Sequence, residues 1–290
     1  MRYVISSLFG AAALFCSLSS ANAVTIYGTA EIGGGASTLY NIDPNTGIAA
    51  PIGTGIGFDR VSGIDFDPTT GILYGMGATD TFQLITINTT TGVGTSVGPT
   101  GLGYSFQDIN FRSDGTLFGF AGSNIFTIDL MTGAATLVGF VGHAQGSGNA
   151  LAFDPSDTLY NFVGADIYTI NQMDGFATDT GTNVNYPVDI GTNPRTNAMD
   201  YDLPNNILYA SVAHSIPGQQ AATTNFIAQI DPTTGNVSNV HLTVTGLDGL
   251  AVLPEQMMTP PPNGVPEPMS TLCLVPVLIG LFAVRRFCRA

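Results

Sequence analysis

Lysine and tryptophan are absent from this chain of 290 residues, and cysteine occurs at only three positions. Cys16, Cys273 and Cys288 all lie near the two ends of the chain. The middle of the chain, residues 24–264, therefore has no thiol for a disulfide bond or for metal ligation. The lack of lysine also excludes Schiff-base chemistry and a lysine anchor for phosphate groups.

Positive charge is scarce as well. The chain has 21 Asp and Glu residues against seven Arg, which gives a net charge of −14. Residues 24–264 contain all but one of the acidic residues and only three arginines, Arg60, Arg112 and Arg195. Such an acidic surface repels phosphate backbones, which excludes nucleic acid as a partner. Most of the aspartates stand beside Gly, Pro, Asn or Thr, a setting typical of turns.

The first residues have the composition of a secretory signal peptide. Arg2 provides positive charge, residues 4–20 are mostly apolar, and Ala21 and Ala23 are the small residues that a signal peptidase reads. This pattern predicts export through the secretion machinery and removal of residues 1–23. A lipoprotein signal is the alternative, because one cysteine lies within the apolar run.

The last residues combine three features in a fixed order. They are the motif Val265, Pro266, Glu267 and Pro268, an apolar run over residues 269–284, and a basic end with Arg285, Arg286 and Arg289. The apolar run is shorter than the ~20 residues of an ordinary membrane-spanning helix, and it contains Pro276. By the positive-inside rule, the basic end stays in the cytoplasm. Residues 257–264 form a Pro-rich linker before this tail.

This tail resembles the PEP-CTERM sorting signal that exosortase-type enzymes process in Gram-negative bacteria. The resemblance covers residues 265–290 and implies a transient transmembrane helix in the inner membrane, followed by cleavage near Pro266, Glu267 and Pro268. It also implies release to the cell surface or to an extracellular polysaccharide matrix. An ordinary tail anchor with a chance Pro-Glu-Pro is the alternative.

One hairpin occurs five times in residues 24–256. Each copy has a strand rich in Tyr, Phe or Ile that ends in Asp or Asn, then a turn that closes on Gly, then a second strand. The Asp and Asn residues that open the turns are Asp43, Asn88, Asp129, Asn171 and Asp231. An Asp or Asn side chain can accept a hydrogen bond from the N–H two residues on, and Gly supplies the positive φ.

A second hairpin lies between these copies, as in Ile64–Asp67 followed by Ile72–Tyr74. Each unit therefore offers four strands, which is typical of a propeller blade. The last copy, Leu250–Leu253, lacks its partner strand, and Thr25–Gly28 at the other end matches it. The sequence predicts an all-β propeller of five four-stranded blades over residues 24–256, closed by pairing of its two ends. An open β-solenoid, two sandwiches, or a sixth blade in the long last interval are the alternatives.

The Asp-Pro-x-x-Gly turn followed by Leu-Tyr resembles the YVTN/NHL-like class of propellers. It also resembles propeller-like domains that PEP-CTERM proteins often carry. That class includes binders, scaffolds and enzymes, so the resemblance implies the fold and leaves the function open.

Polar residues near the start of each inner strand form the first candidate site. In related propellers these strands begin near one mouth of the central channel, which would make a ring of Ser62, Gln107, Asn149, Asn197 and Asp248. Such a ring can bind a neutral polyhydroxyl ligand, with one carboxylate to orient it. Alternatively, these groups form hydrogen bonds with the backbone of nearby loops or with water in the channel.

The two longest connections, Asp179–Arg195 and His214–Asn225, are a second candidate site.

No metal or catalytic constellation stands out. Asp-x-Asp pairs such as Asp65 with Asp67 and Asp200 with Asp202 suit Ca²⁺, but the full calcium-loop spacing is absent and these aspartates are expected to cap turns. The three histidines share no spacing that would place two on one metal ion. We therefore expect no cofactor, with Ca²⁺ as the one candidate.

Three functions fit the sequence. The leading hypothesis is an exported non-enzymatic propeller that binds or scaffolds extracellular polysaccharide. The second is a polysaccharide hydrolase or lyase that uses Asp carboxylates at the channel mouth, such as Asp248. The third is an acidic matrix protein that binds divalent cations.

Overall fold

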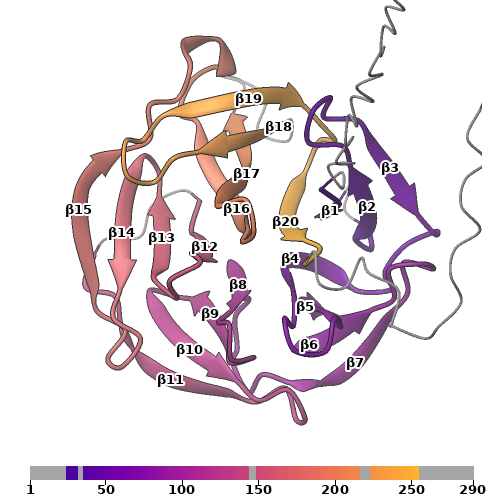
Figure 1. Ribbon diagram of the computed structural model, residues 1–290. Coiled ribbons are helices and arrows are strands. Elements are labelled where there is room, and N and C mark those ends of the chain that lie inside the picture. The colour runs from indigo at the N-terminus through magenta and orange to yellow at the C-terminus, as the bar shows by residue number, and fades with distance from the viewer. Residues whose placement is uncertain (1–23, 32–34, 144–147, 216–222, 255–290) are drawn as a thin grey trace, which may run out of the picture. The chain divides into compact units, whose positions relative to one another are not determined.

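The computed structural model describes residues 24–31, 35–143, 148–215 and 223–254. In this part of the chain, twenty β-strands form five antiparallel sheets of four strands, arranged around an axis as the blades of a propeller (Figure 1). The predicted five-bladed fold is confirmed, and the solenoid and sandwich alternatives are excluded. The predicted signal peptide, linker and sorting tail (1–23, 257–264 and 265–290) lie outside the described residues. No described helix is both long and apolar enough to cross a membrane.

In blades 2 to 5 the chain runs through the four strands from the axis outward, whereas blade 1 has the last strand of the chain innermost. Blade 1 consists of β20 (Leu247–Val252), β1 (Ile26–Ala30), β2 (Thr38–Ile42) and β3 (Ala49–Ile52). Blade 2 consists of β4 (Asp59–Phe66), β5 (Leu73–Ala78), β6 (Phe82–Ile87) and β7 (Gly94–Pro99). Blade 3 consists of β8 (Asp108–Phe111), β9 (Leu117–Ala121), β10 (Asn124–Ile128) and β11 (Ala135–Phe140). Blade 4 consists of β12 (Ala150–Phe153), β13 (Leu159–Val163), β14 (Asp166–Ile170) and β15 (Ala177–Asn183). Blade 5 consists of β16 (Arg195–Asp202), β17 (Ile207–Ser215), β18 (Thr223–Ile230) and β19 (Val237–Leu242).

The ring closes where the first and last strands meet. Strand β1 pairs antiparallel with β20, which places Ile26 opposite Val252 (Figure 1). The backbone N–H of Leu253 extends the pairing by donating to the carbonyl of Thr25 over 2.9 Å. The predicted closure is therefore confirmed. Because the described strands all lie between residues 26 and 252, the ring is complete without either candidate targeting segment.

The long last interval contains no sixth blade in the described residues. It is taken up by a short 3-10 helix, η1 (Val188–Ile190), and by longer strands in blade 5. Strand β16 has 8 residues where β12 of blade 4 has 4, and β17 has 9 where β13 has 5.

The repeated turns form as their chemistry predicts. Asp43 accepts a hydrogen bond of 2.8 Å from the N–H of Asn45, and Gly47 closes the turn with a φ of 73°. The equivalent bonds in the other copies are made by Asn88, Asp129, Asn171 and Asp231. These bonds hold the outer hairpins in one geometry around the ring.

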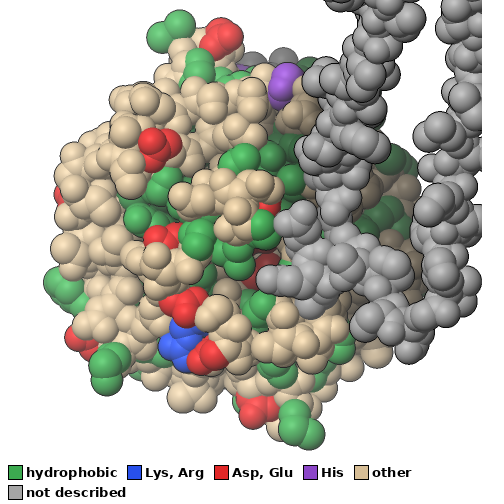
Figure 2. All heavy atoms as spheres, viewed as in Figure 1, with side chains coloured by type: hydrophobic (Ala, Val, Ile, Leu, Met, Phe, Trp, Pro, Cys, Tyr) green, Lys and Arg blue, Asp and Glu red, His purple; other side chains and the backbone are tan. Residues whose placement is uncertain are grey.

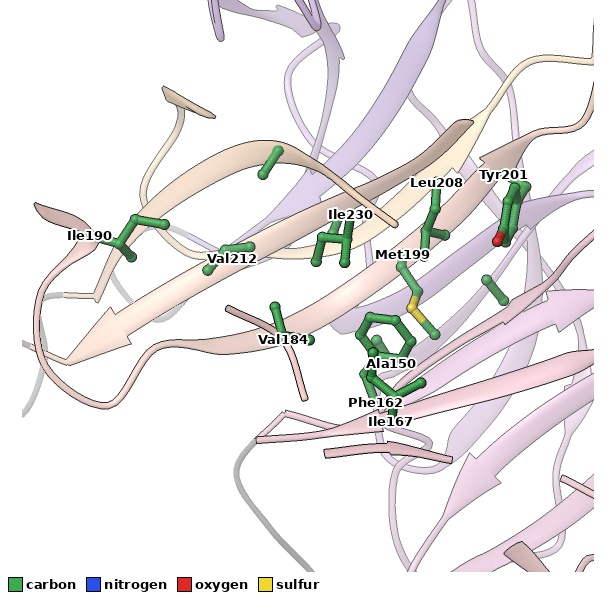
Figure 3. Packing of buried hydrophobic residues seen from close by; sticks show 13 residues of the cluster. Ala150, Phe162, Ile167, Val184, Ile190, Met199, Tyr201, Leu208, Val212 and Ile230 are labelled. Carbon is green, nitrogen blue, oxygen red and sulfur yellow. The ribbon is translucent and has the colours of Figure 1, made fainter. Parts of the chain in front are cut away.

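The core lies between the blades, where buried side chains of neighbouring sheets pack face to face. Figure 3 shows the cluster between blades 4 and 5, with Phe162 and Ile167 of blade 4 beneath Met199 of blade 5. Near the axis the inner strands approach closely. A Cβ on Gly63 of β4 would lie 2.7 Å from the backbone nitrogen of Ile109 in β8. This close approach leaves little open space along the axis.

Candidate functional site

The predicted ring residues lie near the starts of the five innermost strands. Gln107 and Asn149 directly precede β8 and β12, and the other three lie in the first half of β4, β16 and β20. Ser62 Oγ donates a hydrogen bond of 2.6 Å to the carbonyl of Phe106. Asn197 Nδ2 donates one of 3.2 Å to Asp248 Oδ1. The two contacts tie blade 2 to the start of blade 3, and blade 5 to blade 1.

Two polar groups at this end of the strands have distinctive surroundings. Asp248 is reached by solvent, yet desolvation by the surrounding protein raises its pKa, an effect that the charge of Arg195 opposes. Gln107 Oε1 is buried and accepts no hydrogen bond from the described residues. This mouth of the channel therefore contains the carboxylate of Asp248, which Asn197 binds, and the buried amide oxygen of Gln107, which has no described donor.

Four buried polar side chains line the axis, and sequence reasoning did not place them there. Asp65, Asp108, Asn110 and Asp200 are between 0% and 7% exposed. Each accepts a hydrogen bond from a backbone N–H of the next blade: Asp65 from Phe111 (2.6 Å), Asp108 from Leu151 (2.9 Å), Asn110 from Phe153 (2.8 Å) and Asp200 from Val252 (2.7 Å). An innermost strand has a sheet partner on only one side, so the backbone N–H groups along its other edge need hydrogen-bond acceptors. These side chains supply them.

The expectation that these aspartates cap turns is wrong for Asp65 and Asp200. It is correct for Asp67, whose Oδ1 accepts the N–H of Thr69 over 2.8 Å. Asp65 and Asp200 lie two residues earlier in their repeats, within the strands. A polar residue between two buried apolar ones, as in Ile64-Asp65-Phe66, was the available signal for a role inside the fold.

Burial changes the protonation of the axial carboxyls. Desolvation raises the pKa of Asp200 to about 6, and it raises the pKa of Asp65 and of Asp108 well above the usual range. The nearby charge of Asp200 raises the pKa of Asp65 further. Asp200 accepts three hydrogen bonds, from the backbone N–H groups of Tyr201 and Val252 and from the amide of Asn110. With a pKa of about 6, Asp200 is largely ionised near pH 7, and its charge favours the protonated form of Asp65.

A small cavity lies at the end of the axis opposite the predicted ring. Its volume is about 80 Å³, with Asp65, Asn110 and Asp200 among its lining residues. Four prolines also line it, Pro68, Pro155, Pro204 and Pro254. This volume suits a few water molecules, each of which occupies about 30 Å³ in the liquid.

A larger groove lies between blades 4 and 5. Its volume is about 480 Å³. Tyr160 of β13 and Tyr201 of β16 line it, together with Gln229 of β18 and the carboxylates of Asp154 and Asp231. It combines aromatic rings, hydroxyls and acceptors at one surface site. Sequence reasoning missed it because its residues come from two separate repeats.

Two of the three histidines, His143 and His214, pack against neighbouring side chains. His143 stacks on Tyr168 with ring centroids 4.4 Å apart, and its Nε2 is 3.1 Å from Asn161 Oδ1. His214 lies against Phe226 and covers Gly191 in the long connection before β16. Most of the second long connection, residues 216–222, lies outside the described residues.

Metal ligands do not gather in the described part of the chain. No group of three or more His, Cys, Asp or Glu side chains there is placed to hold a metal ion. On the face seen in Figure 2, acidic side chains are spread among polar and apolar ones, with little basic surface between them.

Together, the blades and the polar sites define a β-propeller protein. No family model and no curated protein matches the chain. Among solved structures, TolB from Acinetobacter baumannii is 11% identical over 80% of this chain and 67% of its own, with a TM-score of 0.47. A putative gluconolactonase is 14% identical over 79% and 81%, with a TM-score of 0.46. Virginiamycin B lyase from Staphylococcus aureus is 17% identical over 66% and 70%, with a TM-score of 0.37. At such low identity these likenesses concern the fold alone.

Proposed function

We propose that the protein is an exported, non-enzymatic propeller that binds or scaffolds polysaccharide at the cell surface or in the extracellular matrix. The observation that carries this proposal is the pairing of β1 with β20. A secretory signal and a sorting tail are both cut away, so the body between them must fold without them. A ring that is complete between residues 26 and 252 meets this requirement.

The surface of the ring supports a binding role. It is acidic and has no lysine, and it offers hydroxyl, amide and carboxylate groups in the mouth and in the groove between blades 4 and 5. These groups form hydrogen bonds with hydroxyl-rich polymers, whereas the negative net charge of −14 disfavours polyanions such as nucleic acids.

The two ends of the chain provide the route of export. Signal peptidase cuts after Ala23, and the apolar run before Arg285 and Arg286 holds the chain in the inner membrane for a time. An exosortase then cuts near Pro266-Glu267-Pro268 and releases the propeller to the outside.

Expression in a Gram-negative host with an exosortase system tests this route. We expect cell fractionation to find the protein outside the inner membrane, and mass spectrometry to find a chain that begins at Val24 and has lost its basic end. Glu267→Ala should leave the uncut chain in the membrane fraction, whereas Pro260→Ala in the linker should be processed normally. An uncut chain in the cytoplasm would overturn the proposal.

A second candidate is a polysaccharide hydrolase or lyase. The observation in its favour is that Asp65 and Asp200, both with raised pKa, line the same small cavity, because acid–base pairs in enzymes are tuned in this way. Against it, both carboxyls are bound to backbone N–H groups that hold the blades together. Turnover of a polymer by the purified chain that is abolished by Asp248→Asn or Asp200→Asn, with the fold intact, would favour the enzyme.

A further inference from the structure

Three of the blade interfaces share one aromatic pair near the end of the inner strand. The second strand of one blade supplies one ring, and the innermost strand of the next blade supplies the other. The pairs are Tyr27 with Phe66, Tyr74 with Phe111 and Phe118 with Phe153, with ring centroids 5.4 to 5.6 Å apart. Each pair fills its interface with apolar surface.

The interface between blades 4 and 5 departs from this rule. Tyr160 and Tyr201 occupy the two equivalent positions, but their rings do not form an aromatic pair of this kind in the described structure, although both belong to the same apolar cluster. Both residues line the groove of about 480 Å³. Ligand sites usually have volumes of about 300–1,000 Å³. The groove is thus large enough for a ligand, unlike the axial cavity.

The hydroxyl of Tyr201 is the most informative group in the groove. Tyr201 is only 6% exposed, and its hydroxyl makes no hydrogen bond to any described residue. The oxygen is nevertheless not among the buried side-chain atoms that lack a partner, so it is open to solvent. The three aromatic residues at the equivalent position, Phe66, Phe111 and Phe153, carry no hydroxyl. The fold therefore does not require this group, and the hydroxyl can bind a partner from outside the chain.

Two carboxylates, Asp154 and Asp231, line the groove. Their Oδ1 atoms accept hydrogen bonds within their own turns, whereas Oδ2 of Asp154 accepts none from the described residues and Oδ2 of Asp231 accepts one, from Thr234. Gln229 is already bound on both sides, by Tyr209 and Asn239. Burial raises the pKa of both groove tyrosines. The nearby Tyr160 raises the pKa of Tyr201 further, and the charges of Asp154 and Asp231 raise both, so both phenols keep their protons. A fitting ligand brings hydroxyl donors for the carboxylates, acceptors for the phenols, and an apolar face for the rings. A negative charge on the ligand would be repelled.

We infer that the groove between blades 4 and 5 binds a neutral, hydroxyl-rich saccharide chain, with hydrogen bonds to the hydroxyls of Tyr160 and Tyr201. This inference rests on the proposed function and gives it a site and a ligand class. The sugar hydroxyls donate to Asp154 and Asp231. The same carboxylates exclude uronate-containing polymers.

Isothermal titration of residues 24–256 with neutral hexasaccharides (glucan, mannan and galactan) and with uronate hexamers tests the inference. At least one neutral chain should bind, and the uronates should not. Tyr201→Phe and Tyr160→Phe should each weaken binding about tenfold, the effect of one lost hydrogen bond. Both variants introduce a residue that another blade already has at that position, so the fold should tolerate them. Tyr74→Phe, at the position equivalent to Tyr160 in blade 2, is the matched control and should bind as wild type does.

Asp231→Asn tests the exclusion of acidic chains. Asn88 and Asn171 open the equivalent turns in blades 2 and 4, so asparagine is compatible with the fold. This variant should gain measurable binding of uronate hexamers. If wild type binds neutral chains and both tyrosine variants bind equally well, the inference fails and the proposed function stands. Preference for uronates in wild type also overturns the inference, and no binding to any chain overturns the binding role itself.

Discussion

The carboxylate of Asp200 accepts a hydrogen bond of 2.7 Å from the backbone N–H of Val252. This bond ties blade 5 to the strand that closes the ring. Asp200 also binds the N–H of Tyr201 and the side-chain amide of Asn110, so one side chain connects three inner strands. The polar axis thus has a structural role that the hydrophobic interfaces between the blades cannot fulfil, because they leave the inner backbone edges unpaired.

Asp200→Ala should destabilise the propeller strongly. It leaves two buried backbone N–H groups and one amide without an acceptor, at about 1–3 kcal/mol for each unsatisfied group. We expect the free energy of unfolding in urea to fall by about 3–5 kcal/mol. Asp179→Ala is the control, because the exposed Asp179 of β15 accepts a hydrogen bond only from the N–H of Gly181 in the same strand. Equal stability of the two variants would contradict the role given to the axis.

Stability should increase as the pH falls from 7 to about 4. The folded-state pKa of Asp200 is about 6 against the usual value of 3.8, so the native state holds a proton that the unfolded chain releases between these values. The stabilisation is complete below pH 3.8 and is lost as the pH rises through 6, an effect of about 3 kcal/mol for this residue. Asp65 and Asp108 act in the same direction.

The turn aspartates have the opposite effect. Hydrogen bonds within the turns lower the pKa of Asp43, Asp129 and Asp231, so their contribution is lost as the pH falls below 3.8. Urea midpoints measured from pH 3 to pH 8 should therefore show a maximum near pH 4. The slope between pH 4 and 6 should become shallower in Asp200→Asn. A midpoint that rises steadily up to pH 7 would show that the axial carboxyls are ionised in the fold.

The sequence predicted the parts of the fold that depend on local chemistry and on repetition. Asp43 and Gly47 specify their turn by themselves, and the match of Thr25–Gly28 to a strand of blade 2 was enough to predict closure. The role of Asp65 was not predictable in this way. The pattern Ile64-Asp65-Phe66 marks a polar residue inside a strand, but whether its side chain meets solvent or the backbone edge of the next blade depends on where that blade lies.

The groove between blades 4 and 5 was also not predictable from local sequence. Tyr160 and Tyr201 belong to different blades, and each alone is an ordinary aromatic residue of its repeat. The signal was present in the alignment of the repeats, where Tyr201 stands against three phenylalanines. Its meaning appeared only when the two tyrosines proved to line one groove without forming the aromatic pair of the other interfaces.

Thr29→Val should weaken the closure of the ring. The buried Thr29 Oγ1 donates a hydrogen bond of 2.6 Å to the carbonyl of Val61 and accepts one of 3.1 Å from the N–H of Gly249. Valine has nearly the same shape but leaves both backbone groups unpaired, which should cost about 2–4 kcal/mol. Hydrogen exchange should increase most in β1 and β20. Thr178→Val, at an exposed site in β15, should change neither measurement.

Gly63→Ala should be among the most damaging single-carbon additions in the ring. The new Cβ would lie 2.7 Å from the nitrogen of Ile109 and 2.9 Å from the Cα of Asp108, so β4 and β8 would have to move apart. The backbone of β8 cannot move aside as a flexible side chain can. We therefore expect the free energy of unfolding in urea to fall by about 3 kcal/mol or more. Gly103→Ala is the matched control, since its Cβ would meet nothing within 4 Å and its φ is not in the left-handed region. If Gly63→Ala were as stable as Gly103→Ala, the inner strands would be less tightly apposed than the structure shows, and the axis would have room for a wider channel.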